Sequence, residues 1–245
     1  MGGAPQGLRI LDLACDEGNF AIQLAQLGAA EVVGVEARDH VKRAVERGKT
    51  LGLDNARFEQ GDVRAITAET HGTFDVVLCL GILYHLDTPH VFAFAENLAG
   101  VTGRFAIIET NVSLSKRRKE MHEGREYWGK SYPEDLAMPG ASIDNPQSFW
   151  PTKASLLNLL QRVGFTTVSE VHIPAIPIVD AMRDHVVLIA AKGGRQNFDP
   201  PQPAQWPEHL PRGAHPTQGL RWRIVERARR LRGGGLPAVF RGPPS

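Results

Sequence analysis

Residues Ile10–Phe20 read Ile-Leu-Asp-Leu-Ala-Cys-Asp-Glu-Gly-Asn-Phe, and this stretch decides the fold. A short apolar run ends at Asp12, a turn of small and polar residues follows, and a helical apolar period begins near Phe20. A strand, a tight turn and a helix in this order open a nucleotide-binding α/β unit, in which the N-terminus of the helix faces the ligand. The stretch therefore predicts a ligand site at the carboxyl end of a first strand.

The acidity of the turn indicates which ligand the site prefers. Glu36 ends the next strand-like run, where a carboxylate is placed to bind the hydroxyls of an adenosine ribose. Ala14 and Asp16 stand where the dinucleotide fingerprint has glycines, and only Gly18 remains. A pyrophosphate would be repelled by Asp16 and Glu17, whereas a cationic ligand would be attracted. The turn therefore favours S-adenosylmethionine, whose sulfonium and ammonium groups are positive.

Length and composition narrow the class of protein. A chain of 245 residues with 42% hydrophobic residues suits one α/β domain with an appendage. The 28 basic and 27 acidic residues nearly balance, so there is no overall attraction to nucleic acid or membrane. Two cysteines favour a reduced protein over a disulfide scaffold, and no Cys/His cluster has metal-ligand spacing. No apolar run approaches the ~20 residues that span a bilayer. We expect a soluble, cytoplasmic protein without a metal site.

Strand and helix patterns alternate along the first two thirds of the chain. The first helix is expected to bury Phe20, Leu24 and Leu27, and the second to begin with Asp39 as its N-cap. This rhythm predicts a doubly wound, seven-stranded, mostly parallel sheet with an antiparallel edge strand and the order 3-2-1-4-5-7-6. The expected strands are 8–13, 31–35, 56–59, 74–80, 104–108, 165–173 and 184–191.

The composition divides the chain into three parts. Residues 1–194 form the expected α/β domain, in which 112–149 is a polar insertion on the substrate side. A linker rich in proline and glutamine follows at 195–216. Residues 217–245 carry an arginine-rich helix and tail. That helix is either a solvated surface helix or a contact with RNA or another anionic surface.

The acids and turns at the strand ends resemble those of class I S-adenosylmethionine-dependent methyltransferases, which have a Rossmann-like fold. The resemblance implies that Asp12 and the turn hold the methionine part of the cofactor. It also implies that Glu36 binds the ribose and that Asp62 binds the adenine amine. The expected cofactor-binding residues are Asp12, Ala14, Asp16, Gly18, Glu36, Ala37, Asp62, Val63 and Leu80.

A closer similarity covers roughly residues 8–175. Gly81–His85, Glu109-Thr110, and Asn145 with Phe149–Thr152 recur in an order and spacing similar to the tRNA wobble-uridine carboxymethyltransferase group and related methyltransferases. Two features depart from that group. The chain begins almost at its first strand, without the group's N-terminal basic and aromatic region, and Leu86-Asp87 replace basic residues. Both departures favour ordinary methyl transfer from unmodified cofactor. The chain is then either a fragment of a longer protein or one whose basic tail folds over the site.

The catalytic candidates follow the fourth and fifth strands. Histidine changes charge near neutral pH, so His85 suits the role of accepting a proton from a hydroxyl or amine. Tyr84 and Glu109 are the alternatives, although each of the three residues also has a structural interpretation as a hydrogen-bonding or capping group. The expected substrate contacts are Asn111, Tyr127, Asn145 and Trp150.

Three functions stay open at this point. The first is methylation of an oxygen or nitrogen of a small-molecule metabolite, and the second is a tRNA-modifying methyl- or carboxymethyltransferase. The third is a non-catalytic binding module with the same fold, which the residues Ala14 and Asp16 in the turn keep open. The insertion 112–149 has no readable motif, so the sequence identifies neither the acceptor nor an oligomeric state.

Overall fold

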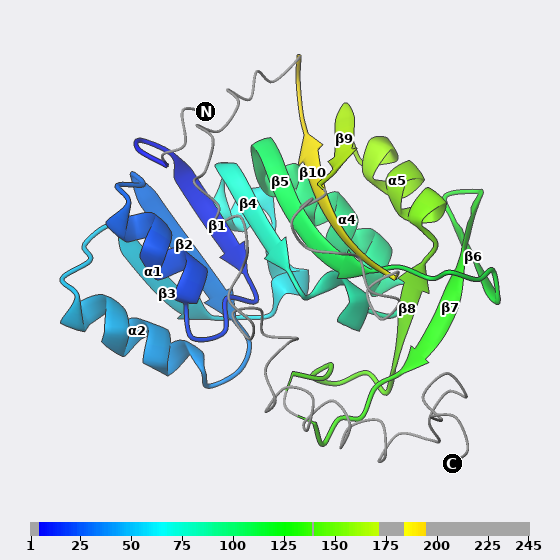
Figure 1. Cartoon of the computed structure of the whole chain (residues 1–245), viewed down its shortest axis with the longest axis horizontal. Helices are drawn as coiled ribbons and strands as arrows, with labels where there is room; N and C mark the ends of the chain where they lie inside the picture. Colours follow the sequence, from blue (N-terminus) through cyan, green and yellow to red (C-terminus); the bar gives the residue numbers. More distant parts are fainter. Residues whose placement is uncertain (1–4, 139, 172–183, 195–245) are drawn as a thin grey trace, which may run out of the picture. The chain divides into compact units, whose positions relative to one another are not determined.

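A computed structural model describes residues 5–138, 140–171 and 184–194 (Figure 1). The predicted linker 195–216 and arginine-rich helix 217–245 lie outside the described residues and stay predictions. In the described part, the chain forms a seven-stranded sheet and a smaller three-stranded sheet. None of its helices has the length and apolar character needed to span a bilayer.

The large sheet has the strand order that the sequence predicts. Its order is β3-β2-β1-β4-β5-β10-β9, which confirms the doubly wound, mostly parallel class. Strands β3 to β5 pair in parallel, and β10 runs antiparallel to both of its neighbours. The strands are β1 (Arg9–Leu13), β2 (Glu31–Glu36), β3 (Ala56–Gln60), β4 (Phe74–Leu80), β5 (Thr102–Asn111), β9 (Thr167–Glu170) and β10 (His185–Ala191).

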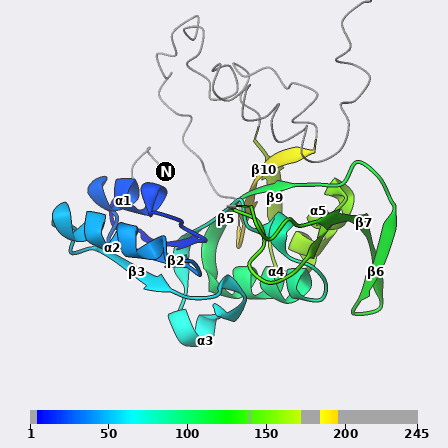
Figure 2. The same cartoon turned by 90° about the horizontal axis from the view of Figure 1, so that it is seen from below.

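Different helices bury the two faces of this sheet (Figure 2). Because side chains alternate along a strand, Leu11 faces the core under α4 and α5, while Ile10 faces the core under α1. The carboxyl ends of the parallel strands stay open at one edge, which is where sheets of this kind bind ligands. The helices are α1 (Asn19–Gln26), α2 (Val41–Thr50), α3 (Ala68–His71), α4 (His90–Val101) and α5 (Lys153–Arg162), with 3-10 turns η1 (Val63–Ala65) and η2 (Leu83–His85).

Two helix predictions are wrong in detail. Phe20 and Leu27 are each 57% exposed, and α1 instead buries Ala21, Ile22 and Ala25. The sequence carries two apolar stripes on this helix, and the stripe with alanines faces the sheet because small side chains allow the closer approach.

The second error concerns the start of α2. The N-cap position is His40, and the Asp39 carboxylate bonds Lys42 instead of a helical amide. The hydrogen bond that would make Asp39 a cap is therefore replaced by an exposed ion pair.

The insertion 112–149 is more ordered than its composition suggests. It contains β6 (Arg118–His122) and β7 (Arg125–Pro133), which pair with β8 (Gln147–Pro151) in an antiparallel sheet. Arg118 ties this sheet to the main domain through an ion pair with Asp87 at 2.9 Å. Its guanidinium also lies over the ring of Phe149.

Candidate active site

A cavity of about 410 Å³ lies at the carboxyl ends of β1, β2 and β4. This volume is within the usual range for small-molecule and cofactor sites. The wall from the strand ends includes seven residues of the expected cofactor set: Ala14, Asp16, Glu36, Ala37, Asp62, Val63 and Leu80. Five residues of the segment 81–86, which contains η2, also line the cavity, and residues 140–145 of the insertion complete the wall. The structure thus brings together parts of the chain that are far apart in sequence.

The turn after β1 keeps the left-handed backbone that glycines would allow. The φ angles are 57° at Ala14, 52° at Asp16 and 74° at Gly18. A non-glycine residue in this region costs roughly 1–2 kcal/mol because its Cβ crowds the carbonyl oxygen. The chain therefore retains the ligand-binding shape of the turn at the expense of backbone strain. Gly18 itself does not line the cavity, and a Cβ there would lie 2.8 Å from Phe58.

The Glu36 carboxylate is held rigidly at the cavity wall. It is 4% exposed, and its two oxygens accept the backbone amides of Asp16 at 3.1 Å and Arg38 at 2.8 Å. Each carboxylate oxygen has two lone pairs, so both can accept a further hydrogen bond from the cavity. Two parallel acceptors in a fixed position suit the adjacent hydroxyls of a ribose.

Asp12 lies behind the turn and is 2% exposed. Its Oδ2 is a buried atom without a hydrogen-bond partner in the part of the chain that the structure describes. Burial is the main cause that raises the pKa of Asp12 to about 7. A hydrogen bond from the Ala21 amide lowers this pKa, and the negative charge of Glu36 raises it. A buried carboxylate oxygen without a partner is costly, and a cationic ligand nearby would relieve that cost. This orphaned atom fits the positively charged methionine part of S-adenosylmethionine.

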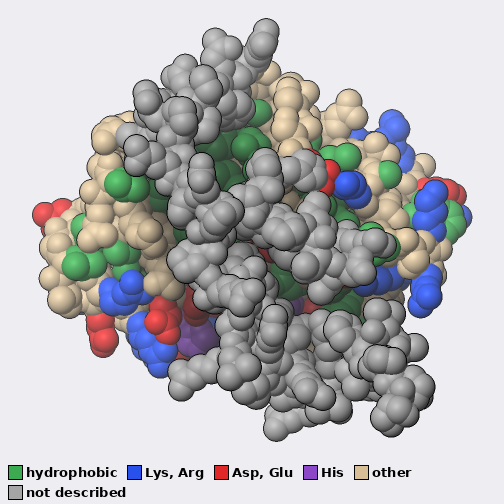
Figure 3. Space-filling model, viewed as in Figure 1, with side chains coloured by type: hydrophobic (Ala, Val, Ile, Leu, Met, Phe, Trp, Pro, Cys, Tyr) green, Lys and Arg blue, Asp and Glu red, His purple; other side chains and the backbone are tan. Residues whose placement is uncertain are grey.

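The acids of the turn have basic partners on α2. Asp16 Oδ1 lies 2.7 Å from His40 Nδ1, and Glu17 pairs with Arg43. Figure 3 shows acidic and basic side chains close together over this helix. The sequence places both acids against the ligand, but of the two only Asp16 lines the cavity, because Glu17 turns toward α2.

Asp62, the expected adenine contact, is bound by Arg64. The Asp62 side chain caps η1 by accepting the Arg64 amide at 2.9 Å, and it pairs with the guanidinium at 2.6 Å. Burial opposes ionisation of Asp62, but the hydrogen bonds from Arg64 outweigh it and lower the pKa of the carboxyl. Arg64 also pairs with Asp144 of the insertion.

His85 and Tyr84 both line the cavity. Burial raises the pKa of Tyr84 to about 12, and the charges of Glu109 and Glu134 add to this, so the phenol stays protonated at neutral pH. Its backbone carbonyl accepts the indole N–H of Trp150 at 2.8 Å. His85 Nδ1 lies 3.1 Å from Glu134 Oε1.

Glu134 is a residue that the sequence does not point to. Its side chain is 3% exposed, although it sits in a polar segment without a helical or strand period. Its partner lies 49 residues earlier in the chain, so no local pattern connects the two residues. The one available signal is the carboxylate itself, and the insertion contains several.

Three of the expected substrate contacts lie away from the cavity wall. Tyr127 as a substrate contact is wrong, since the residue is 2% exposed and packs on Phe92 with its ring centroid 5.0 Å away. Trp150 is 6% exposed and supports Tyr84 from behind. Asn111 ends β5 opposite His185. The fourth, Asn145, does line the cavity, where its amide donates to the His85 carbonyl at 3.0 Å.

Glu109 also lies outside the cavity wall. It forms an ion pair with His185 of β10, and the hydrogen bond from this pair raises the pKa of His185. Engaged in this way, Glu109 is a poorer candidate for the proton acceptor than His85.

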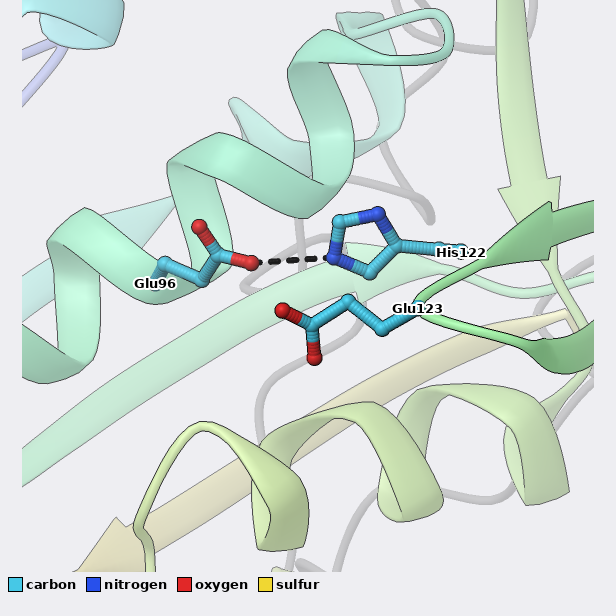
Figure 4. Close-up of side chains that lie close together, drawn as sticks. All are labelled: Glu96, His122 and Glu123. Carbon is cyan, nitrogen blue, oxygen red and sulfur yellow. Dashed lines mark hydrogen bonds and ion pairs between the residues drawn. The ribbon is translucent and has the colours of Figure 1, made fainter.

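A separate titratable cluster joins the β6–β7 hairpin to α4 (Figure 4). The possible ligand atoms of Glu96, His122 and Glu123 lie within 4.8 Å of one another. His122 Nε2 pairs with Glu96 at 2.9 Å, and the imidazole stacks on Phe92. None of the three residues lines the cavity, and their contacts fasten the hairpin to the helix.

The seven-stranded sheet, the acidic turn and the carboxylate at the end of β2 define the fold and site of a class I methyltransferase. A methyltransferase domain family model matches residues 5–164, and the chain belongs to this family. S-Adenosylmethionine is therefore the cofactor that fold and family indicate.

Several relatives are similar to parts of this chain. The N-terminal domain of EvdMO1, solved in the presence of SAH and D-fucose, is 27% identical with a TM-score of 0.65, over 76% of this chain and 77% of that one. A 23S rRNA (uracil(1939)-C(5))-methyltransferase RlmD from Shewanella sp. (strain MR-4) is 53% identical over 64 residues, 25% of this chain and 14% of the relative.

A ubiquinone biosynthesis O-methyltransferase from Maricaulis maris is 35% identical over 88 residues, 36% of this chain and 34% of the relative. The matched segments thus span well under half of these curated relatives.

Proposed function

We propose that this protein transfers the methyl group of S-adenosylmethionine to an oxygen or nitrogen of a small-molecule acceptor. The observation that carries the proposal is the cavity, whose lining includes both a fixed carboxylate, Glu36, and His85. The cofactor supplies an activated methyl group on its sulfonium. The protein then has to align the acceptor with that methyl group and to exclude water.

The chain's own residues divide this work. Glu36 would hold the ribose, and the unpartnered Oδ2 of Asp12 would favour the cationic methionine part. Residues 140–145 cover the cavity and restrict access of water. In this proposal His85 would accept the acceptor's proton, whereas Tyr84, whose raised pKa keeps its phenol protonated, would contribute hydrogen bonds.

Two comparisons support a small acceptor. The relative named for ubiquinone biosynthesis is an O-methyltransferase, and the EvdMO1 domain was solved in the presence of D-fucose. Cys15 and Cys79 are buried and free, and burial raises the pKa of both thiols, so neither suits a nucleophile's role. Free thiols are compatible with a reducing compartment, and a cytoplasmic location belongs to the proposal.

The alternative acceptor is RNA. It is favoured by the 64-residue similarity to RlmD and by the arginine-rich segment 217–245, which lies outside the described residues. The resemblance to the wobble-uridine carboxymethyltransferase group stays a prediction. A methylation assay with both kinds of acceptor distinguishes the two proposals.

The first experiment is a calorimetric titration of the full chain with S-adenosylmethionine. We expect micromolar binding, worth about 7–8 kcal/mol, which Glu36→Ala abolishes and the exposed control Glu46→Ala retains. If the wild type does not bind S-adenosylmethionine, the proposal is wrong. The second experiment offers labelled cofactor with metabolite pools, total tRNA and ribosomal RNA. Label found in RNA alone would overturn the small-molecule acceptor.

A further inference from the structure

Glu134 follows directly after β7, and its side chain is almost fully enclosed. The carboxylate accepts two hydrogen bonds from serines and has a third hydrogen-bond contact, with His85. Oε1 receives the hydroxyl of Ser148 at 2.7 Å, and Oε2 receives the backbone amide of Ser142 at 3.1 Å. His85 Nδ1 lies between the two oxygens, 3.1 Å from Oε1 and 3.2 Å from Oε2. The Glu134 side chain is 3% exposed, so its oxygens depend on His85, Ser142 and Ser148 for hydrogen bonds.

This contact defines the hydrogen-bonding state of the imidazole. Beside an ionised carboxylate, which only accepts hydrogen bonds, Nδ1 of His85 would be the nitrogen that carries the proton. In the neutral ring the second nitrogen, Nε2, is then an acceptor. Within the described residues Nε2 has no hydrogen-bond partner, and His85 is one of the residues that line the cavity. The acceptor nitrogen is therefore available to a bound molecule.

We propose that Glu134 is a positioning residue that keeps His85 in the tautomer with Nε2 available to the methyl acceptor. This inference rests on the proposed function. With a hydroxyl acceptor, the oxygen bonds to the methyl carbon, the carbon–sulfur bond breaks with its electron pair left on sulfur, and the hydroxyl proton moves to Nε2. The positive charge that leaves the sulfonium reappears on the imidazolium, directly beside the Glu134 carboxylate. Glu134 thus orients the ring and stabilises the charge that forms on it.

The same carboxylate also links the base to the cover of the cavity. Ser142 lies in the segment 140–145 that lines the cavity, and Ser148 lies in β8. The hydrogen bonds from Ser142 and Ser148 would be the same if Glu134 had a purely structural role. That role, however, would not determine which imidazole nitrogen of His85 carries the proton. The tautomer therefore separates the two roles.

The test is nitrogen NMR of the histidine rings in the full chain, with the probe S-adenosylhomocysteine bound. His85→Gln assigns the His85 signals among the nine histidines. In the wild type we expect one neutral tautomer, protonated at Nδ1. Glu134→Ala should lose this single-tautomer signal, and Glu134→Gln should restore it because the amide oxygen still accepts from Nδ1. The exposed control Glu126→Gln, on β7, should match the wild type.

Two results would overturn the inference: a wild-type proton on Nε2, or a Glu134→Ala spectrum identical to the wild type. Circular dichroism and calorimetry with S-adenosylhomocysteine show that each variant is folded. A wild type that fails to bind S-adenosylhomocysteine contradicts the proposed function instead, and the tautomer still reports on the contact. With an acceptor in hand, Glu134→Ala should lower kcat by about a hundredfold or more while leaving KM little changed.

Discussion

Arg64 Nη2 lies 2.7 Å from Asp144 Oδ2, although the two residues are 80 positions apart in the chain. The same guanidinium pairs with Asp62, which also lines the cavity. One side chain therefore joins the strand-end wall of the cavity to the insertion segment that lines it.

Breaking this link should loosen the cover. Asp144 is about half exposed, so its ion pair is worth at most about 1 kcal/mol. We expect Asp144→Asn to weaken binding of S-adenosylmethionine by roughly fivefold or less, and the loss should shrink at high salt because salt screens the wild-type pair. Calorimetry at two ionic strengths measures both effects. Asp135→Asn, an exposed change nearby, is the control, and equal affinities for the two variants would disprove the link.

The buried carboxyl of Asp12 should make stability depend on pH. Its pKa is about 7 in the folded protein, above the value near 4 of an unfolded chain. The folded state therefore binds more protons between these values, and the free energy of unfolding falls as pH rises, by up to about 1.4 kcal/mol per pH unit from this group. Asp12→Asn removes this contribution. Urea unfolding across that range checks the prediction, and identical slopes in both proteins would contradict it.

The strained turn should tolerate glycine. Ala14 has a φ of 57°, which glycine adopts without a Cβ clash. Relief of roughly 1–2 kcal/mol of strain, offset by about 0.4–1 kcal/mol of added unfolded-state entropy, predicts that Ala14→Gly raises stability slightly. Ala93→Gly on the exposed face of α4 should instead lower it by about 1 kcal/mol. Thermal unfolding of both variants decides, and a clear fall in Tm for Ala14→Gly would refute the strain.

The His185–Glu109 ion pair should also make stability depend on pH, but in a higher pH range than Asp12 does. Its hydrogen bond raises the pKa of His185 in the folded protein. The stabilisation is complete below the unfolded histidine value near 6.5 and is lost as pH rises through the folded value. His185→Gln should therefore reduce the Tm more at mildly acidic pH than at alkaline pH. A Tm difference that does not vary with pH would show that the pair contributes no charge-dependent stability.

Residues near the strand ends were the most predictable part of this protein. The strand order follows from the alternation of apolar runs with helical periods, and Glu36 and Asp62 follow because an acid ends or follows each of two strands. Both positions depend on local sequence. The face of α1 was not predictable from period alone, because Phe20 and Ala21 belong to competing stripes and only packing against the sheet selects one.

The acceptor side was harder because its contacts are long-range. β6 has few apolar residues, and its strand form depends on pairing with β7. Glu134 reaches His85 only after the hairpin has brought the segment back to η2. Tyr127 misled for the opposite reason, since an aromatic residue in a polar segment suggested a contact surface, whereas it fills the core between α4 and α5.

The insertion leaves and rejoins the domain at neighbouring points, because Ser113 bridges Thr152. An insertion whose two ends lie next to each other can change in length or sequence while the main sheet keeps its register. In this chain the insertion contains Glu134, Ser142 and Asn145. A graft of a different insertion between Ser113 and Thr152 would therefore exchange the cavity residues 140–145 and the His85 partner Glu134 in one step. The main sheet, with the residues proposed to bind the cofactor, would stay the same while residues 113–152 are replaced.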